Sequence, residues 1–200
     1  MEVITVNLPE TLHDLTLVQL QRLEPVMAEQ DAEVRAQAVC SIVYKMTGAQ
    51  VRAAARRDIA TLVAAVDKVL SEEPRLIMRF KLGEVEYGFI PDLERITTAE
   101  WVDLETLGFQ TEDLHKIMAV LFRPVADARG DKYSIVPYAP EHSNAELMKS
   151  MPADVAKAAI LFFSHLGLAC LSATLKSESQ TRTRTSHGNG SLKSGGGTPL

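Results

Sequence analysis

LIMRFKLGEVEYGF, residues 76–89, is the stretch that decides the fold class. Apolar and polar side chains alternate on both sides of Gly83-Glu84, with Phe80 and Leu82 before this dipeptide and Val85 and Tyr87 after it. A period of two is typical of a β-strand, and a glycine between two such runs favours a tight turn. The stretch therefore predicts a β-hairpin, and its flanks decide what surrounds it.

The residues before the hairpin predict mainly helix. A run rich in β-branched residues over 3–8, closed by Pro9, favours a short opening strand. Thr16 and Asp31 can then cap two helices whose apolar residues recur every three or four positions. The first has Leu17, Leu20, Leu23 and Val26 on one face, and the second has Val34, Ala38, Ile42 and Met46 and ends at Gly48.

Two more helices complete this half of the chain. A short helical turn is expected over 50–55, and Asp58 is expected to cap a longer helix that Pro74 ends. The inward face of the longer helix is expected to hold Ile59, Leu62, Val63, Val66, Val69 and Leu70.

Beyond the hairpin the sequence predicts further helices and one more strand. Thr97 or Thr98 opens a helix with Glu100 in its first turn, and Thr111 caps the next helix, which stops at Pro124. The first of these has Trp101, Leu104 and Leu107 on one face, and the second has Leu114, Ile117, Met118, Leu121 and Phe122. A strand over 133–136, a small helix from Asn144 and a last helix with Pro152 in its first turn follow.

The predicted fold class is α+β, a mainly helical single domain over 1–175 with a small antiparallel β-hairpin or sheet. A disordered tail over 176–200 is expected because Ser, Thr and Gly dominate after Lys176 and cannot bury enough surface to offset chain entropy. This tail carries a net charge of +3, which leaves −8 for residues 1–175. It is either a solvated terminus, dispensable for folding, or a tether.

Composition excludes several classes of function. The net charge of −5 argues against broad binding of a nucleic-acid backbone, which needs clustered positive charge. The most apolar stretch, 158–173, is interrupted by Ser164, His165 and Ser172 and falls short of the roughly 20 residues of a membrane span. The first residues lack the layout of a signal peptide, and the two cysteines lie far apart, which indicates a reducing, cytoplasmic setting.

Catalytic and metal-binding signatures are missing from the sequence. The five histidines stand alone, and neither CxxC nor HExxH occurs. A thiolate activated by histidine would need a distant pair, His115 with Cys170 or His165 with Cys40, and nothing in the sequence orients either pair. The glycine-rich run at 194–198 follows no strand and precedes no helix, so it does not predict a phosphate loop. No catalytic, cofactor or metal residue is assigned.

Four weaker features each have an ordinary structural interpretation beside a functional one. The acidic pairs Asp92 with Glu94 and Asp103 with Glu105 are typical of solvated faces. His115 is expected to be a structural, hydrogen-bonded histidine. The aromatic residues are expected to be core, and the last helix is either central to the core or meets another chain. These aromatic residues are Trp101, Phe109, Phe122, Phe162 and Phe163.

Arg52, Arg56 and Arg57 form the compact basic cluster of the chain. On helical spacing Arg52 and Arg56 share a face, which could contact a phosphate or an acidic partner. The alternative is an ordinary solvated helix face.

Three stretches together resemble a family of tailed-bacteriophage proteins, the tail assembly chaperones. They are VEYGFIPDLERITTAEWVDLE at 85–105, LHKIMAVLFRP at 114–124 and MPADVA at 151–156. The similarity covers roughly residues 1–175, and its motifs are structural phrases, not catalytic signatures. It implies a non-enzymatic protein of the infected bacterial cytoplasm, absent from the mature virion and without cofactors.

The resemblance also implies a partner. Such chaperones bind the long helical tape measure protein, or other phage tail proteins, and keep it soluble until tail tube subunits polymerise around it. In several phages a longer form is made by frameshifting near the C-terminus. Two alternatives stay open: a structural virion component of the neck, tail or head, and a small enzyme or regulator unrelated to phage. Neither nucleic acid nor membrane is an expected partner, and a homo-oligomer is left open.

Overall fold

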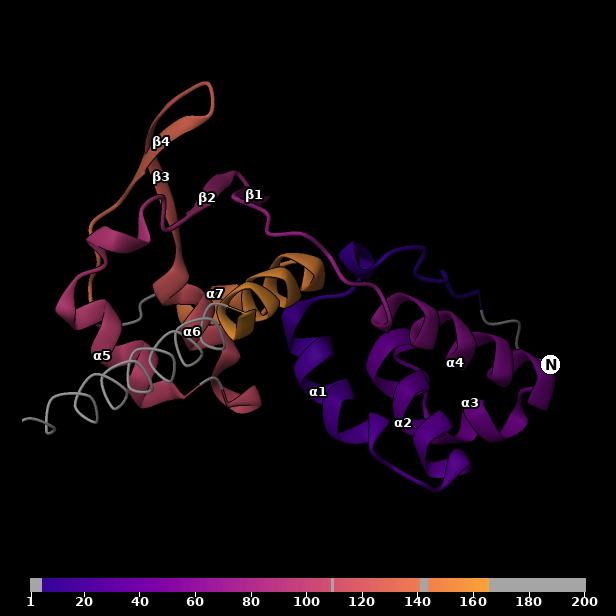
Figure 1. The fold of residues 1–200 in the computed structure, drawn as a ribbon. Coiled ribbons are helices and arrows are strands. Elements are labelled where there is room, and N and C mark those ends of the chain that lie inside the picture. Colours follow the sequence, from indigo (N-terminus) through magenta and orange to yellow (C-terminus); the bar gives the residue numbers. More distant parts are fainter. Residues whose placement is uncertain (1–4, 109, 141–143, 166–200) are drawn as a thin grey trace, which may run out of the picture. The chain divides into compact units, whose positions relative to one another are not determined.

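The computed structural model describes residues 5–108, 110–140 and 144–165. Helices outweigh a four-stranded antiparallel sheet, which confirms the predicted α+β class (Figure 1). The chain divides into two compact units, Met1–Ile160 and Leu161–Leu200. The predicted boundary at 175 and the predicted tail over 176–200 lie outside the described residues.

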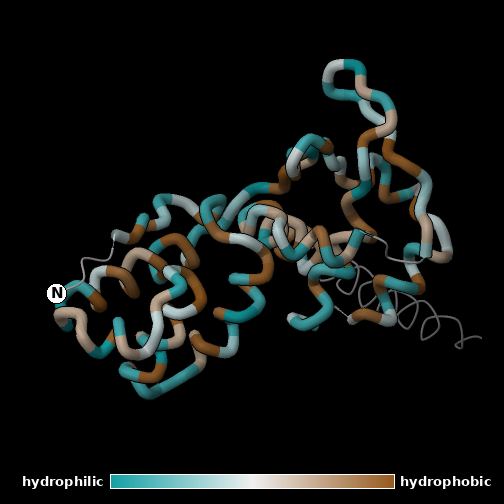
Figure 2. The backbone as a smooth tube through the Cα atoms, turned by 180° about the vertical axis from the view of Figure 1, so that it is seen from behind, coloured by the Kyte–Doolittle hydropathy of each residue, from teal (hydrophilic) through white to brown (hydrophobic). Residues whose placement is uncertain are grey.

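The first two helices form where their caps predict. The Thr16 side chain accepts from the Gln19 N–H at the start of α1 (Leu17–Met27), and Asp31 accepts from two N–H groups at the start of α2 (Ala32–Tyr44). A core cluster joins them to η1 (Leu12–Asp14) and α4 (Arg56–Leu70), and Figure 2 shows these helices as mixed hydrophobic and hydrophilic segments. Its buried members are Leu12, Leu15, Leu23, Val39, Val66, Val69 and Ala153.

Four details of this half differ from the predictions. The opening strand is wrong for residues 5–8, which are in no regular element. Helix α2 ends at Tyr44 because Lys45 turns left-handed at φ 56°, so Gly48 begins α3 (Gly48–Ala53) instead of ending α2. The α2 residue Val34 is 53% exposed, because the buried face of this helix is centred on Val39 and Cys40. Asp58 lies in the first turn of α4 and does not cap it.

The predicted hairpin is confirmed. Strand β1 (Arg79–Leu82) pairs antiparallel with β2 (Val85–Phe89), and Gly83 makes the turn at φ 60°. Strands β3 (Phe122–Arg129) and β4 (Lys132–Ile135) extend it to a sheet of order β1-β2-β3-β4. Its buried aromatic rings pack on one another, with centroids 5.3 to 5.7 Å apart for Phe80 with Tyr87 and for Phe122 with Phe80 and Phe89.

Helix α6 (Leu114–Leu121) runs directly into strand β3. The sequence predicts a helix that continues to Pro124, which is wrong, because Phe122 already pairs with Phe89 of β2. The Ile90 N–H donates to the Leu121 carbonyl at 3.0 Å, so strand pairing begins where the helix ends. Proline also disfavours helical backbone at the preceding residue, which is consistent with this earlier end. Thr111 begins a separate short helix, η3 (Thr111–Asp113).

Helix α5 (Thr98–Leu107) begins at Thr97 with a capping box that includes Glu100. Glu100 and Leu104 are its buried residues, so Trp101 lies off that face and is 57% exposed, against the prediction of a core aromatic. Phe122 is fully buried as predicted, Phe162 and Phe163 are half-buried, and Phe109 lies outside the described residues. A further short helix, η2 (Leu93–Arg95), precedes α5.

The end of the first unit packs against the start of the chain. Helix α7 (Ala145–Met148) follows Asn144 as predicted, and residues 153–165 are helical after Pro152. Two backbone hydrogen bonds of 2.8 Å flank a bridge between Thr16 and Pro152, from Leu17 N–H to Met151 and from Ala153 N–H to Leu15. These bonds join segments far apart in sequence. From its apolar pattern, the last helix is predicted to continue through Leu166, Cys170 and Leu171, which lie outside the described residues.

Candidate functional site

An open groove between α2, α3 and α4 is the candidate functional site. Its volume is about 600 Å³, and apolar and small side chains dominate its lining. Helix α4 contributes one continuous face, at positions 56, 59, 60, 63, 64 and 67, and α2 contributes 32, 33, 36 and 37. Lining residues three and four apart lie along one side of a helix, so the wall formed by α4 spans about three turns, or roughly 16 Å. Val51 and Arg52 of α3, and Ala54 just after it, complete the lining.

The floor of the groove suits the close approach of another helix. Ala60 and Ala64 are exposed on α4, and the partly exposed Ala36 lies on α2. Ile59 and Val63 are half-buried, since each also packs onto a core cluster beneath the groove. Small side chains let helix axes come near one another, and branched side chains beside them provide contact area. The surface is therefore apolar without being filled.

The two ends of the groove carry opposite charge. Arg52 and Arg56 line one end, and Glu33 and Asp67 line the other. Asp67 also accepts from Arg35, whose Nη2 lies 2.6 Å from Oδ1. Within the described residues, Glu33, Arg52 and Arg56 form no ion pair. Their charges are consequently available to a partner.

Beneath the groove, a partly buried tyrosine joins α2 to α4. The Tyr44 hydroxyl donates to the Leu62 carbonyl at 2.8 Å. Burial, followed by the nearby Cys40, raises the pKa of Tyr44 to about 12, so the phenol stays protonated and keeps this bond at neutral pH. Cys40, Met46 and Leu62 form a small buried cluster at this point. The groove therefore lies on a packed support.

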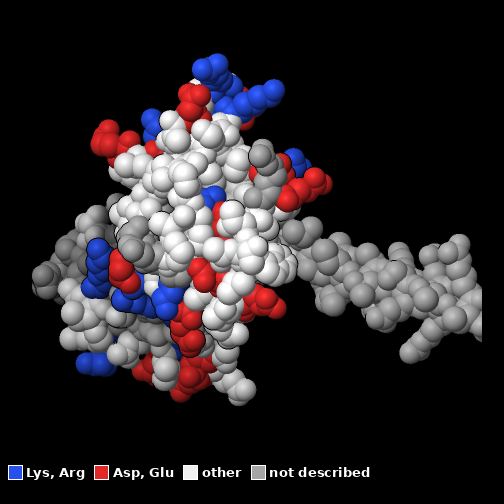
Figure 3. Space-filling view, turned by 90° about the vertical axis from the view of Figure 1, so that its left-hand side faces the viewer, with Lys and Arg blue, Asp and Glu red and all other residues white. Residues whose placement is uncertain are grey.

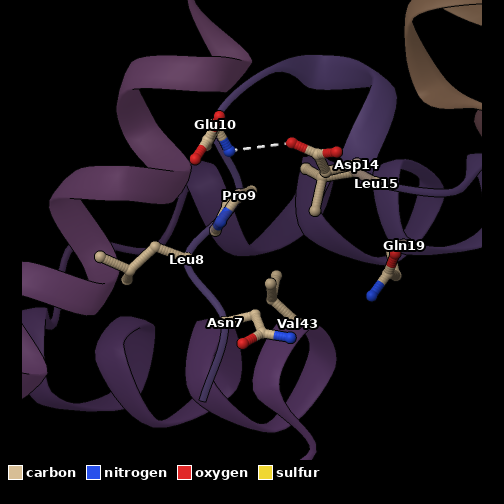
Figure 4. Close-up of a pocket in the computed structure, with 8 residues that line it drawn as sticks. All are labelled: Asn7, Leu8, Pro9, Glu10, Asp14, Leu15, Gln19 and Val43. Atoms are coloured by element: carbon tan, nitrogen blue, oxygen red, sulfur yellow. Dashed lines mark hydrogen bonds between the residues drawn. The ribbon is translucent and has the colours of Figure 1, made fainter.

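A second cavity, of about 440 Å³, lies between residues 7–10, the start of α1 and Val43 of α2 (Figure 4). Two of its polar side chains, Asp14 and Gln19, already bond to nearby backbone. Asp14 accepts from the Glu10 N–H at 2.8 Å and from the Thr11 N–H at 3.0 Å, and these two bonds lower its pKa. Gln19 accepts from the Thr16 N–H at 2.9 Å. These groups stabilise helix starts, which makes the first groove the better candidate for binding.

His115 and Cys40, one member of each possible histidine–cysteine pair, lie in the first unit. His115 is buried on α6, where Gln21 lies 3.5 Å from its Nδ1 and burial lowers its pKa. Cys40 is buried too, and burial raises the pKa of its thiol, which disfavours a thiolate. Cys170 lies outside the described residues, and Cys40 and His165 belong to different units.

The acidic pairs serve other purposes. Asp92 accepts from the Glu94 N–H at 3.0 Å and caps η2, while Asp103 accepts from the Tyr138 hydroxyl. In the part of the chain that the structure describes, no three side chains of His, Cys, Asp or Glu are placed to hold one metal ion. The same part contains no helix long and apolar enough to cross a membrane.

The basic cluster is the predicted feature that meets the groove. Arg52 and Arg56 line the same end although they lie on different helices, α3 and α4, and share no helix face. Arg57 points elsewhere, with a side chain that is 93% exposed. The alanines of the groove were not singled out from the sequence; the signal was their spacing on α4, where Ala60 and Ala64 interrupt an otherwise branched apolar face.

A second surface surrounds the sheet. Figure 3 shows charged side chains at the top of the view and again over its lower part, with a largely uncharged surface between them. Trp101 and Val102 of α5 are 57% and 49% exposed, and Val85 and Val136 near the sheet are 42% and 41% exposed. They line neither of the two cavities described above, so the groove is the stronger candidate for binding.

Known proteins give no indication of the function of this chain. No family model, curated protein or solved structure matches this chain. The groove and its charged ends are therefore the basis for the function proposed below.

Proposed function

We propose that this protein is a non-enzymatic tail assembly chaperone of a bacteriophage that binds the tape measure protein during tail morphogenesis. The observation that supports this function best is the open apolar groove between α2, α3 and α4. A long helical protein exposes apolar stripes until tail tube subunits cover it. A chaperone for such a protein needs a groove in which an amphipathic helix can lie.

The dimensions of the groove suit that occupant. Its α4 wall spans about three turns, and exposed alanines leave room for a helix axis at roughly the 8–10 Å separation of packed helices. Binding to the soluble state of the partner, but not to its aggregate, would shift the equilibrium toward the soluble state. Under this proposal the protein acts in the cytoplasm of the infected host and is absent from the mature virion. Nucleic acid and membrane are not among its partners.

A structural role in the virion is the second candidate, and the sheet supports it. Strands β1 and β4 are the outer strands, and within the described residues their outer edges pair with no other strand. Free strand edges can pair with a neighbouring subunit. The exposed Trp101 and Val102 would add apolar contact area to such an interface.

The groove can be tested by filling it. The double substitution Ala60→Gln with Ala64→Gln places two long polar side chains over the floor of the groove. Ala53→Gln with Thr61→Gln is the matched control, because these positions are exposed on α3 and α4 and do not line the groove. Each variant is co-expressed with the tape measure protein of the same phage, and the soluble fraction of that protein is measured. Loss of solubility with the first variant alone is expected; equal solubility with both would overturn the proposal.

The two candidates are separated by location. Quantitative mass spectrometry of infected-cell lysate, affinity-purified complexes and purified particles measures where the protein resides. Abundance in lysate, together with the tape measure protein and absence from particles, is expected for the chaperone. Fixed stoichiometry in the particle would establish the structural component instead.

A further inference from the structure

The groove face of α4 is complementary to itself when its direction is reversed. This face consists of a cation at one end, an anion at the other, and two branched and two small apolar side chains between them. In chain order these residues are Arg56, Ile59, Ala60, Val63, Ala64 and Asp67. We infer that two copies of this chain associate through the groove, with their α4 helices antiparallel.

The apolar pairs fit by size. In the antiparallel arrangement Ile59 of one copy faces Ala64 of the other, and Val63 faces Ala60. Each branched side chain thus meets a small one, so that the two faces interdigitate as packed helices do. A two-fold axis through the middle of α4 repeats both contacts, as an isologous dimer requires.

The charges pair at both ends. Arg56 of one copy faces Asp67 of the other, and the two-fold axis repeats this pair. The Arg35 guanidinium occupies Oδ1 of Asp67, whereas Oδ2 accepts no hydrogen bond within the described residues, which leaves it for the second copy. Charge-assisted hydrogen bonds of this kind fix register as well as contributing affinity.

The side walls of the groove carry the same pattern. Glu33 lies at the end that receives Arg56 of the second copy, and Arg52 lies at the end that receives its Asp67. Among the charged residues that line the groove, each one that approaches an end therefore meets charge of the opposite sign. A parallel arrangement would place arginine on arginine and aspartate on aspartate, and these repulsions exclude it.

The interface is short. Three helical turns and two charge pairs cover less surface than a stable dimer buries, so the association is weak, concentration-dependent and sensitive to salt. The dimer would occupy the surface proposed above for the tape measure helix. That consequence rests on the proposed function, whereas the dimer itself does not. A partner helix that binds the groove would separate the two copies.

The test is sedimentation velocity of the full chain over a concentration series at low salt. Two charge variants are prepared: Arg52→Glu with Arg56→Glu, and Glu33→Lys with Asp67→Lys. Each variant is repulsive toward its own copies, so each should dimerise at least about ten-fold more weakly than the wild type. A mixture of the two has opposite charges at both ends, so it should form a one-to-one heterodimer. The control is Arg57→Glu, which makes one of the same charge reversals outside the groove.

The outcomes separate the inference from the proposed function. A wild-type chain that stays monomeric, or a dimer that the arginine variant does not weaken, would overturn the antiparallel dimer and leave the chaperone test standing. Circular dichroism checks folding. If Asp67→Lys disturbs the fold through Arg35, the arginine variant decides alone, because Arg52 and Arg56 are exposed. Weakening by Ala60→Gln with Ala64→Gln, with no effect of Arg57→Glu, is the expected companion result.

Discussion

Nη1 of Arg123 lies 2.6 Å from Oε1 of Glu100, which joins β3 to α5 by an ion pair whose side chains are only 11% and 3% exposed. Glu100 also accepts from the Thr97 N–H at 2.6 Å, as the capping box of α5 requires. The guanidinium carbon of Arg123 lies over the Tyr138 ring, 5.6 Å from the centroid of that ring. One carboxylate therefore connects a helix start to a strand, and the arginine of that strand contacts the loop that holds Tyr138.

Replacing Glu100 by Ala should be strongly destabilising. The substitution leaves the Arg123 charge buried without its anion, and removing one partner of a buried ion pair typically costs about 3–5 kcal/mol. The control is Glu105→Ala on the exposed side of the same helix, which should be near neutral. Urea unfolding of both variants measures the difference. Equal stability of the two would mean that the pair does not hold α5 to the sheet.

Leu121→Ala and Leu147→Ala form a matched pair of deletions. Leu121 is fully buried at the end of α6, whereas Leu147 on α7 is 45% exposed. The buried substitution leaves a cavity and should cost about 2–5 kcal/mol, and the exposed one should cost much less. Thermal unfolding monitored by circular dichroism gives both values. A smaller loss at Leu121 than at Leu147 would contradict the assignment of α6 to the core.

The stability of the protein should fall as the pH drops below neutrality, because of His115. Burial holds its pKa below the usual 6.5, and Lys149 contributes in the same direction. The unfolded chain then binds a proton near pH 6.5 that the folded chain does not bind. The free energy of unfolding therefore decreases as the pH falls through 6.5 toward the folded pKa. The charged groups around the imidazole are Lys149, Glu146, Lys116 and Asp113.

This dependence is measured by urea unfolding at several pH values on either side of that window. His115→Gln should flatten the slope, because glutamine does not titrate. His13→Gln, at an imidazole that is 62% exposed, serves as the control for a changed histidine. An unaltered slope in the His115 variant would assign the dependence to other groups.

Gly88→Ala should disturb the sheet. A Cβ at Gly88 would lie 2.5 Å from Cε2 of Tyr133, inside contact distance, and the Tyr133 hydroxyl is held by the Phe89 carbonyl at 2.7 Å. The ring must therefore move or lose its hydrogen bond. Gly83→Ala is the comparison, since its Cβ meets open space but its backbone is left-handed. Gly88→Ala should cost less stability in a Tyr133→Ala background than in the wild type, as measured by thermal unfolding. An equal cost in both backgrounds would place the strain elsewhere.

Local signals carried most of the fold prediction. Thr16, Asp31 and Thr97 cap their helices through side-chain bonds to residues two or three positions away, so the sequence alone contains the interaction. The hairpin at Gly83 is local in the same sense. The end of α6 is different, because it is fixed by pairing of Phe122 with Phe89, a contact between residues far apart in sequence.

The groove could be predicted only in part. Arg52 and Arg56 stand out as a basic cluster in an acidic chain, and both line the groove. The sequence predicts a shared helix face for the two arginines, which is wrong, because a break between α3 and α4 separates them. Their alignment depends on how α2, α3 and α4 pack. No spacing within one segment encodes that arrangement, nor the acidic end formed by Glu33 with Asp67.

Because α6 passes directly into β3, the helix and the start of the strand should move together. No linker between Leu121 and Phe122 can absorb a rotation. A turn of the helix about its axis therefore re-aims Arg123, and with it the arm of the hairpin that ends at Gly130. Motion of the hairpin tip is therefore coupled to the packing of α6, so a force applied at the tip would act on the helical core.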